Sequence, residues 1–228
     1  RGFSWPQAEG RDKFERFFPF YPPAIDVVRA VSYSLTTIRS ALYFMLQTVK
    51  TQRKLGSNEL ITLWCLFDDV VNYTEDPSGT SKSIASIKTK YPTEWRAYQD
   101  AKRQIDEAIS GPLKAYRSRS EKIVKTLFLY HIANLSPDGL SHEEIMNCVM
   151  EWKDQDAGQT SDLQDNRDHY ELLVEKLDTE LVQVEKVGSK YRFNVQGTGP
   201  NPVDVFQRAR AEAEASEVLR RDAWQQLL

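Results

Sequence analysis

Apolar and polar side chains alternate along two short stretches late in the chain, residues 181–185 and 191–195. A period of two residues is typical of strands that bury one face. The residues expected on the buried face are Val182, Val184, Tyr191, Phe193 and Val195. The residues expected to face water are Gln183, Glu185, Arg192 and Asn194. Gly188-Ser189 suits the tight turn between the strands, because Gly accepts a positive φ, and the pattern therefore predicts a β-hairpin.

Apolar residues three or four positions apart predict helices over residues 120–134, 141–152 and 162–180, just before the hairpin. Three helices followed by a hairpin is the order of elements in a winged helix-turn-helix. Such a module serves either as a DNA reader or as a rigid adaptor inside a larger assembly.

Helical periodicity also dominates the first half of the chain. An apolar seam from Val28 to Val49 follows Pro22-Pro23 and predicts one long helix that ends near Gly56. Asn58 is the expected N-cap of the next helix. Further helices are expected over residues 59–73, 82–90, 93–109 and 202–228.

The predicted fold is therefore mainly α. A helical, lid-like bundle is expected over residues 1–110, followed by a winged helix-turn-helix with one β-hairpin over residues 111–197. Residues 198–228 are expected to form a linker and a trailing C-terminal helix.

The charge of the expected winged helix is strongly negative. Residues 138–186 carry 14 acidic and 4 basic side chains, and the helix over 162–180 has seven carboxylates against Arg167 and Lys176. A helix that enters the major groove approaches phosphates, and its affinity comes mostly from Lys and Arg. This helix would be repelled, which favours an adaptor over a groove reader.

The segment before these acidic residues is positively charged. Residues 80–125 carry 11 basic and 5 acidic side chains, with Tyr91, Trp95, Tyr98 and Tyr116 among them. Basic and aromatic residues together can bind a nucleic-acid backbone, and the candidate contacts are Lys102, Arg103, Arg117 and Arg119. The favoured alternative is a solvated helical face that pairs with the acidic module, because Lys and Arg are exposed whether or not they bind anything.

Composition bounds the class of protein. The chain has 228 residues, 40% hydrophobic and 28% charged, with a net charge of −3, as is ordinary for a globular protein. Its two cysteines lie in apolar helical patterns, so a reducing, cytoplasmic location is expected. No apolar run approaches the roughly 18 residues that span a bilayer, and no membrane partner is expected. The chain starts without Met and stops inside a helical pattern, so we expect a fragment of a longer polypeptide.

Catalytic signatures do not assemble in this sequence. The three histidines, His131, His142 and His169, stand at no spacing that implies a metal site, so no metal is expected. A phosphate-binding loop and a nucleophile motif are both missing. Asp68 and Asp69 follow an apolar run, as carboxylates do in nucleotide sites, but the run is helical by spacing and both are interpreted as solvated helix residues.

Three motifs resemble a known family. Phe18-Pro19-Phe20-Tyr21-Pro22 is similar to the segment that opens the lid of large bacterial P-loop (AAA+-like) ATPases of BREX phage-defence systems, of the BrxC and PglY kind. Thr37-Ile38-Arg39-Ser40-Ala41-Leu42 resembles their lid helix. Residues 123–132, with Leu127-Phe128-Leu129, resemble the helix that opens their winged-helix domain, and Lys190-Tyr191-Arg192-Phe193 resembles the wing.

The resemblance implies a non-catalytic fragment of an ATP-binding phage-resistance ATPase, acting as nucleotide-sensing lid and winged-helix interaction module. Arg39 matches the arginine that senses nucleotide; the alternative is an Arg solvated on an amphipathic helix. ATP and Mg²⁺ would belong to the parent, and no cofactor is expected in this fragment, which lacks the phosphate loop. The expected partners are the ATPase core of the same polypeptide, other defence-system proteins and, as a further candidate, DNA. The alternative function is a stand-alone winged-helix DNA-binding regulator that uses residues 80–125.

Overall fold

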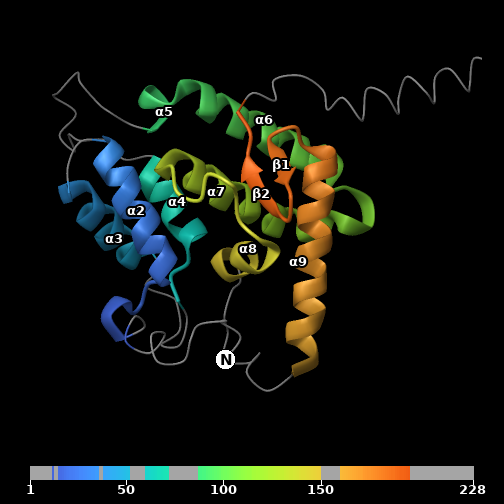
Figure 1. Cartoon of the computed structure of the whole chain (residues 1–228), viewed down its shortest axis with the longest axis horizontal. Helices are drawn as coiled ribbons and strands as arrows, with labels where there is room; N and C mark the ends of the chain where they lie inside the picture. The colour runs from blue at the N-terminus through green and yellow to red at the C-terminus, as the bar shows by residue number, and fades with distance from the viewer. Residues whose placement is uncertain are drawn as a thin grey trace, which may run out of the picture.

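The computed structural model describes residue 12 and residues 15–35, 38–51, 60–71, 87–149 and 160–195. Helices form most of these ranges, and a single hairpin follows the last helix (Figure 1). The elements in chain order are α2 (Pro22–Leu35), α3 (Ile38–Thr51), α4 (Leu63–Val71), α5 (Ile87–Lys90), α6 (Pro92–Ala108), the 3₁₀ helix η1 (Gly111–Tyr116), α7 (Arg117–Ala133), α8 (His142–Val149), α9 (Thr160–Glu180), β1 (Val184–Val187) and β2 (Lys190–Phe193). The mainly helical fold with one hairpin is confirmed.

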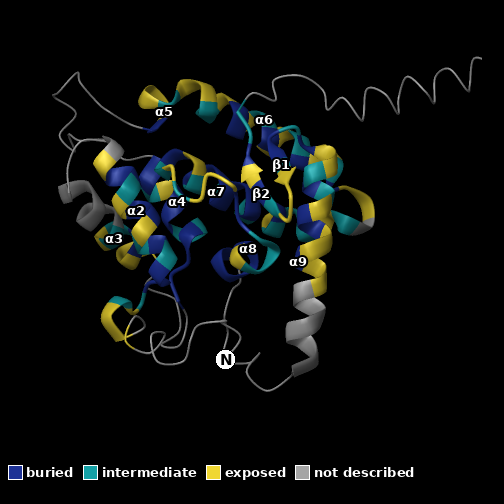
Figure 2. Ribbon diagram, in the orientation of Figure 1, coloured by how far each residue is buried: buried dark blue, intermediate teal, exposed yellow. Residues whose placement is uncertain are grey.

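Helix α7 is the centre of the structure. It packs against α2, α4, α6, α8, α9 and β2, and Figure 2 shows it buried in the middle of the molecule. A helix covered on most sides must be apolar around most of its circumference, as the buried Ile123, Val124, Leu127 and Phe128 are. The fully buried Phe128 contacts the rings of Phe67, Trp95, Tyr98 and Phe193. These aromatic contacts join α4, α6, α7 and β2 in one core.

The prediction of one long helix over Val28–Val49 was wrong. The structure has two helices, α2 and α3, which pack against each other, and α3 also packs against α4. The apolar spacing continues from one helix into the next, so it does not reveal the break; in α3, Met45 packs against the core, whereas Val49, at the end of the seam, is exposed. The expected stop at Gly56 and the cap at Asn58 lie outside the described residues.

The start of the next helix was also predicted wrongly. Residues 60–62 are extended, and α4 begins only at Leu63. Ile61 forms a parallel bridge with Phe20: its N–H donates to the Pro19 carbonyl at 2.7 Å, and its carbonyl accepts from Tyr21 N–H at 2.9 Å. This pairing with the segment before α2 takes the backbone bonds that a helix would have used.

Local signals set the ends of α7 and α8. Asn134 ends α7 in the left-handed conformation with φ of 52°, which Asn tolerates better than most residues. Ser141 precedes α8 and forms a capping box: its hydroxyl accepts from Glu144 N–H at 3.3 Å, and the Glu144 carboxylate accepts from Ser141 N–H at 2.8 Å. α8 therefore starts at a fixed position, with His142 as its first residue.

The hairpin pairs β1 and β2 antiparallel, with Val187 opposite Lys190 across the Gly188-Ser189 turn. Gly188 has φ of +63° and Ser189 does not have a positive φ, as in a type II′ turn. Val184, Tyr191 and Phe193 are buried as predicted.

The prediction that Gln183 faces water was wrong. Gln183 is 3% exposed and belongs to the turn before β1, so the strand alternation does not reach it. Its carbonyl accepts from Asn194 N–H at 2.8 Å, which continues the hairpin pairing one step beyond the strands.

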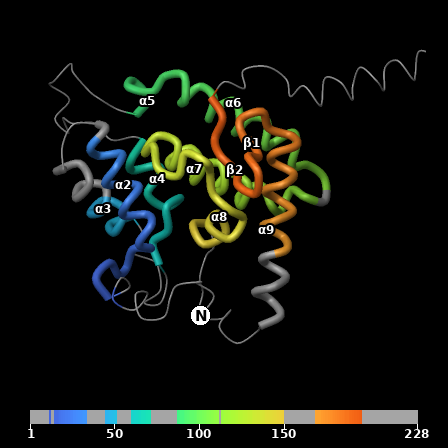
Figure 3. The backbone as a smooth tube through the Cα atoms, in the orientation of Figure 1, coloured from blue at the N-terminus to red at the C-terminus, as the bar shows by residue number. Residues whose placement is uncertain are grey.

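A third extended segment lies beside β2. Leu140, between α7 and α8, exchanges two backbone hydrogen bonds of 2.8 Å with Tyr191. Gly139 has φ of +95°, and a Cβ there would lie 2.5 Å from the Tyr191 carbonyl oxygen. Glycine is therefore required for this segment to approach the strand. Figure 3 shows the resulting path: α7, the segment at Leu140, α8, α9, and the hairpin returning between α7 and α9.

One buried cluster contains residues from both sides of position 110, such as Phe67 and Tyr98 before it and Leu127 and Phe193 after it. The division of the chain at residues 110 and 197 stays a prediction. The expected C-terminal helix, residues 202–228, lies outside the described residues. Within the described ranges, none of the helices combines the length and the apolar character needed to cross a membrane.

Candidate functional site

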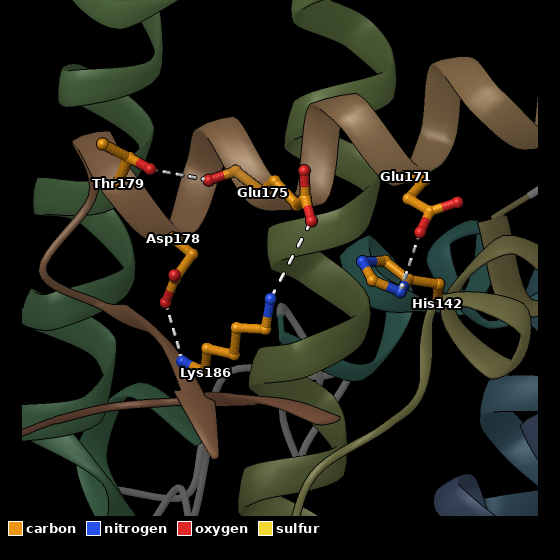
Figure 4. Close-up of polar contacts among 6 residues, drawn as sticks. All are labelled: His142, Glu171, Glu175, Asp178, Thr179 and Lys186. Atoms are coloured by element: carbon orange, nitrogen blue, oxygen red, sulfur yellow. Dashed lines mark hydrogen bonds and ion pairs between the residues drawn. The ribbon is translucent and has the colours of Figure 1, made fainter. Parts of the chain in front are cut away.

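A polar cluster lies where α8, α9 and β1 meet (Figure 4). His142 begins α8, Glu171 and Glu175 stand one turn apart on α9, and Lys186 lies on β1. Residues four apart share one face of a helix, so both carboxylates point to the same side of α9. The packing of α8 and β1 against α9 brings the imidazole and the ammonium to that side.

The four side chains lie close together, but the distances between their charged atoms are longer than those of hydrogen bonds. His142 Nδ1 lies 3.9 Å from a Glu171 carboxylate oxygen, and Lys186 Nζ lies 3.8 Å from a Glu175 carboxylate oxygen. One potential ligand atom from each of His142, Glu171 and Glu175 lies within 4.8 Å of the other two. Both glutamates are about half exposed, at 51% and 49%. The backbone N–H of Lys186 donates to Asp178 at 2.7 Å, which fixes β1 beside α9.

Tyr191 forms the floor of this cluster. It is completely buried, and its ring centroid lies 4.8 Å from that of His142 and 5.4 Å from Lys186 Nζ. The phenol oxygen raises the pKa of Lys186, with further contributions from Glu175 and Asp178. This approach does not meet hydrogen-bond geometry, and both the Tyr191 hydroxyl and His142 Nε2 are buried without a hydrogen-bond partner among the described residues. Unsatisfied buried polar atoms are uncommon and costly.

Two of the residues predicted to contact nucleic acid lie on α6 and are exposed. Lys102 pairs with Glu121 at 3.1 Å, and Arg103 pairs with Asp100 on its own helix. Ion pairs between exposed side chains contribute little, so neither contact prevents binding to another anion.

The other two predicted residues lie at the start of α7, and their side chains contact other elements of the fold. Arg117 donates to the Ile109 carbonyl at 2.7 Å and pairs with Asp106 at 3.2 Å. The Arg119 guanidinium lies 5.8 Å from the ring centroid of Tyr116 and 5.5 Å from that of Tyr170. Arg117 ties the end of α6 to α7, and Arg119 ties α7 to α9.

Tyr98, one of the aromatic residues of the basic stretch, is not available as a platform for bases. Tyr98 is 3% exposed and packs in the core against Phe67, Phe128 and Trp95. A base can stack only on an accessible ring. Tyr98 therefore cannot stack on a base, whereas Tyr91, Trp95 and Tyr116 are partly exposed.

Arg39 is the second residue of α3, and its side chain, like that of Arg167 on α9, lies outside the described residues. The two aspartates of α4 differ from each other. Asp68 is exposed and lies 3.7 Å from Lys125. Asp69 is partly buried and accepts a 2.6 Å hydrogen bond from Thr48, and burial raises its pKa. Asp69 is thus not the solvated residue that was expected.

Sequence reasoning missed the cluster on α9. His142 is far from both glutamates in the chain, so no motif spacing joins them. The spacing of Glu171 and Glu175 was a usable signal for two ligands on one helix face, but only the packing of α8 shows where a third group comes from.

More than half of the chain matches a known family. Residues 4–142 match the model of the BREX System ATPase PglY protein 2nd domain. The chain belongs to this family and is therefore part of a defence-system ATPase. The match ends at His142, so α9 and the hairpin follow it. No curated protein and no solved structure matches the chain.

Proposed function

We propose that this chain is a non-catalytic part of the BREX ATPase and that residues from α7 to β2 form a winged helix used as a protein adaptor. The order α7, α8, α9, β1, β2 and the pairing of Leu140 with Tyr191 support the winged helix. In that topology α9 occupies the place of the recognition helix.

The observation that carries the adaptor proposal is the exposed face of α9. Glu171, Glu175 and Glu180 are exposed, and the helix's Lys176 already pairs with Glu180 at 3.1 Å. Leu172 stands among them and is 64% exposed. An acidic surface with an apolar centre repels phosphates and suits a basic protein surface.

Mutation of Leu172 in the full-length parent tests the adaptor. Leu172→Asp is expected to reduce phage protection without changing ATP hydrolysis, because the substitution alters a contact surface and leaves the core intact. Ala115→Asp is the control, since Ala115 is exposed on η1, outside α9 and outside the proposed lid. Equal protection by wild type and Leu172→Asp in a plaque assay would refute the adaptor on α9.

We also propose that α2 and α3 belong to a lid that senses nucleotide on the parent's ATPase core, through Arg39. ATP and Mg²⁺ would bind to that core. In the full-length parent, Arg39→Ala is expected to slow ATP hydrolysis by removing a charge that stabilises the phosphates. The isolated chain is expected to bind no ATP in calorimetry. An unchanged hydrolysis rate would make Arg39 a surface residue.

The alternative, DNA binding through the basic stretch, is less favoured because Arg117 and Arg119 already hold helices together. Fluorescence anisotropy with a labelled duplex over a salt series tests it. Weak binding that falls steeply with salt is expected, since each neutralised phosphate releases counterions. The double variant Lys102→Glu/Arg103→Glu is expected to abolish this binding. Reversing Arg117 and Arg119 to Glu as well is expected to cause no further loss.

Reversal of Arg167 and Lys176 on α9 serves as the control and is expected to change little. Sequence-specific binding that depends on Arg167 and persists at moderate salt would show that α9 enters the groove, and the adaptor proposal would fail.

A further inference from the structure

We propose that His142, Glu171 and Glu175 form a binding site for a divalent transition-metal ion, with Zn²⁺ as the ion of choice. One imidazole and two carboxylates are a donor set that Zn²⁺ accepts, with a remaining position for water. The site shares Glu171 and Glu175 with the proposed adaptor face of α9, but its test measures binding of the ion alone and does not depend on the adaptor or lid functions.

The geometry needs only a small closure around an ion. Zinc lies about 2.0–2.2 Å from its nitrogen and oxygen ligands, so ligand atoms lie roughly 3–4 Å from one another. The candidate atoms already lie within 4.8 Å of one another. Half-exposed glutamates on one helix face can rotate toward an ion, whereas His142 is held at the capped start of α8. The site therefore has one fixed ligand and two adjustable ones.

A buried polar atom without a partner points to a missing ligand. His142 Nδ1 lies 3.9 Å from Glu171, so an ion shared by both glutamates binds this ring nitrogen (Figure 4). The fully buried Tyr191 presents its hydroxyl, which has no hydrogen-bond partner among the described residues, near the Lys186 ammonium. The phenol can donate to a carboxylate or water bound to the ion.

The ammonium of Lys186 competes with a metal ion for the Glu175 carboxylate. Its ammonium lies 3.8 Å from Glu175 and neutralises part of the charge that an ion would use. The side chain is 42% exposed, so it can leave toward solvent when an ion arrives. Lys186→Met is therefore expected to raise the affinity for Zn²⁺, an effect that no purely structural role of the cluster predicts.

Calorimetry of the whole 228-residue chain with Zn²⁺ at neutral pH tests the site, and the absorption bands of Co²⁺ provide a second readout. One ion per chain is expected. His142→Ala and Glu175→Gln are each expected to weaken binding at least ten-fold, since even groups behind a ligand contribute about 10–100-fold. Circular dichroism confirms that each variant folds, and the half-exposed Glu175 keeps the test valid if His142→Ala does not fold.

His169→Ala and Glu180→Gln are the matched controls, because both residues are exposed on α9 outside the cluster. Both are expected to bind Zn²⁺ like the wild type. A Kd weaker than about 1 mM for the wild type, or unchanged affinity in both His142→Ala and Glu175→Gln, would overturn the proposal.

Discussion

Replacing Gly139 by Ala should destabilise the protein more than the same change at other glycines of positive φ, because an added Cβ at Gly139 clashes with backbone atoms. Gly139 has φ of +95°, and its missing Cβ would lie 2.5 Å from the Tyr191 carbonyl oxygen and 2.7 Å from the carbonyl carbon. Both are backbone atoms, so no side-chain rotation relieves the contact. Leu140 and β2 must move apart, and the two 2.8 Å hydrogen bonds between Leu140 and Tyr191 are lost or lengthened.

The magnitude follows from these two effects. A disfavoured backbone conformation costs about 1–3 kcal/mol, and each of the two hydrogen bonds contributes about 1 kcal/mol. We expect Gly139→Ala to lower the free energy of unfolding by about 3–5 kcal/mol. With an m-value of about 2–3 kcal/mol/M in urea, the unfolding midpoint falls by about 1–2.5 M.

Gly188→Ala and Gly111→Ala are the matched controls. Both glycines have positive φ, +63° and +59°, but nothing lies within 4 Å of an added Cβ. Only the left-handed strain remains, about 1–2 kcal/mol. Urea unfolding followed by circular dichroism measures all three variants. A loss for Gly139→Ala no larger than for the controls would refute the close approach of Gly139 to Tyr191.

Three further predictions concern the core. Phe128→Ala should lower the thermal midpoint by on the order of 10 °C, from an expected loss of about 3–5 kcal/mol, and a shift below about 3 °C would contradict its central place. Burial raises the pKa of Cys148 to about 12, so at pH 8 a thiol reagent should label the partly exposed Cys65 and reach Cys148 only after unfolding; fast labelling of both would contradict its burial. Burial raises the pKa of Asp69 in the folded protein above its pKa in the unfolded chain. The ionised carboxylate therefore lowers stability at neutral pH, and this destabilisation disappears as the pH falls through the folded-state pKa toward the unfolded-state pKa. Asp69→Asn, which still accepts from Thr48, should therefore be more stable at pH 7 in urea unfolding, with a gain that shrinks toward acid pH; a constant gain would exclude the charge as its cause.

Local sequence signals determined much of this fold. Helices α6, α7, α8 and α9 have the expected spacing of apolar residues, and the hairpin has its turn at Gly188-Ser189. These features follow from short-range preferences: a Pro near a helix start, a Gly that accepts positive φ, and an alternation of period two. The family motifs are equally local, and the family is confirmed.

Tertiary contacts decided what the local signals did not contain. Leu60 to Thr62 lie in a helical pattern but are extended, because Ile61 bonds to the backbone around Phe20. Gln183 lies in a strand-like pattern but is buried in the turn that leads from α9 into β1. In each case a partner distant in the chain competes with the local preference for the same backbone groups or the same space.

The candidate site depends on the same distinction. The sequence alone showed that α9 is acidic, since charge is a property of composition. It did not show that His142 faces Glu171 and Glu175, because that juxtaposition exists only when α8 packs across α9 and β1 returns beside it. Ligand groups from separate elements are assembled by packing, and packing is a property of the folded chain rather than of any one segment.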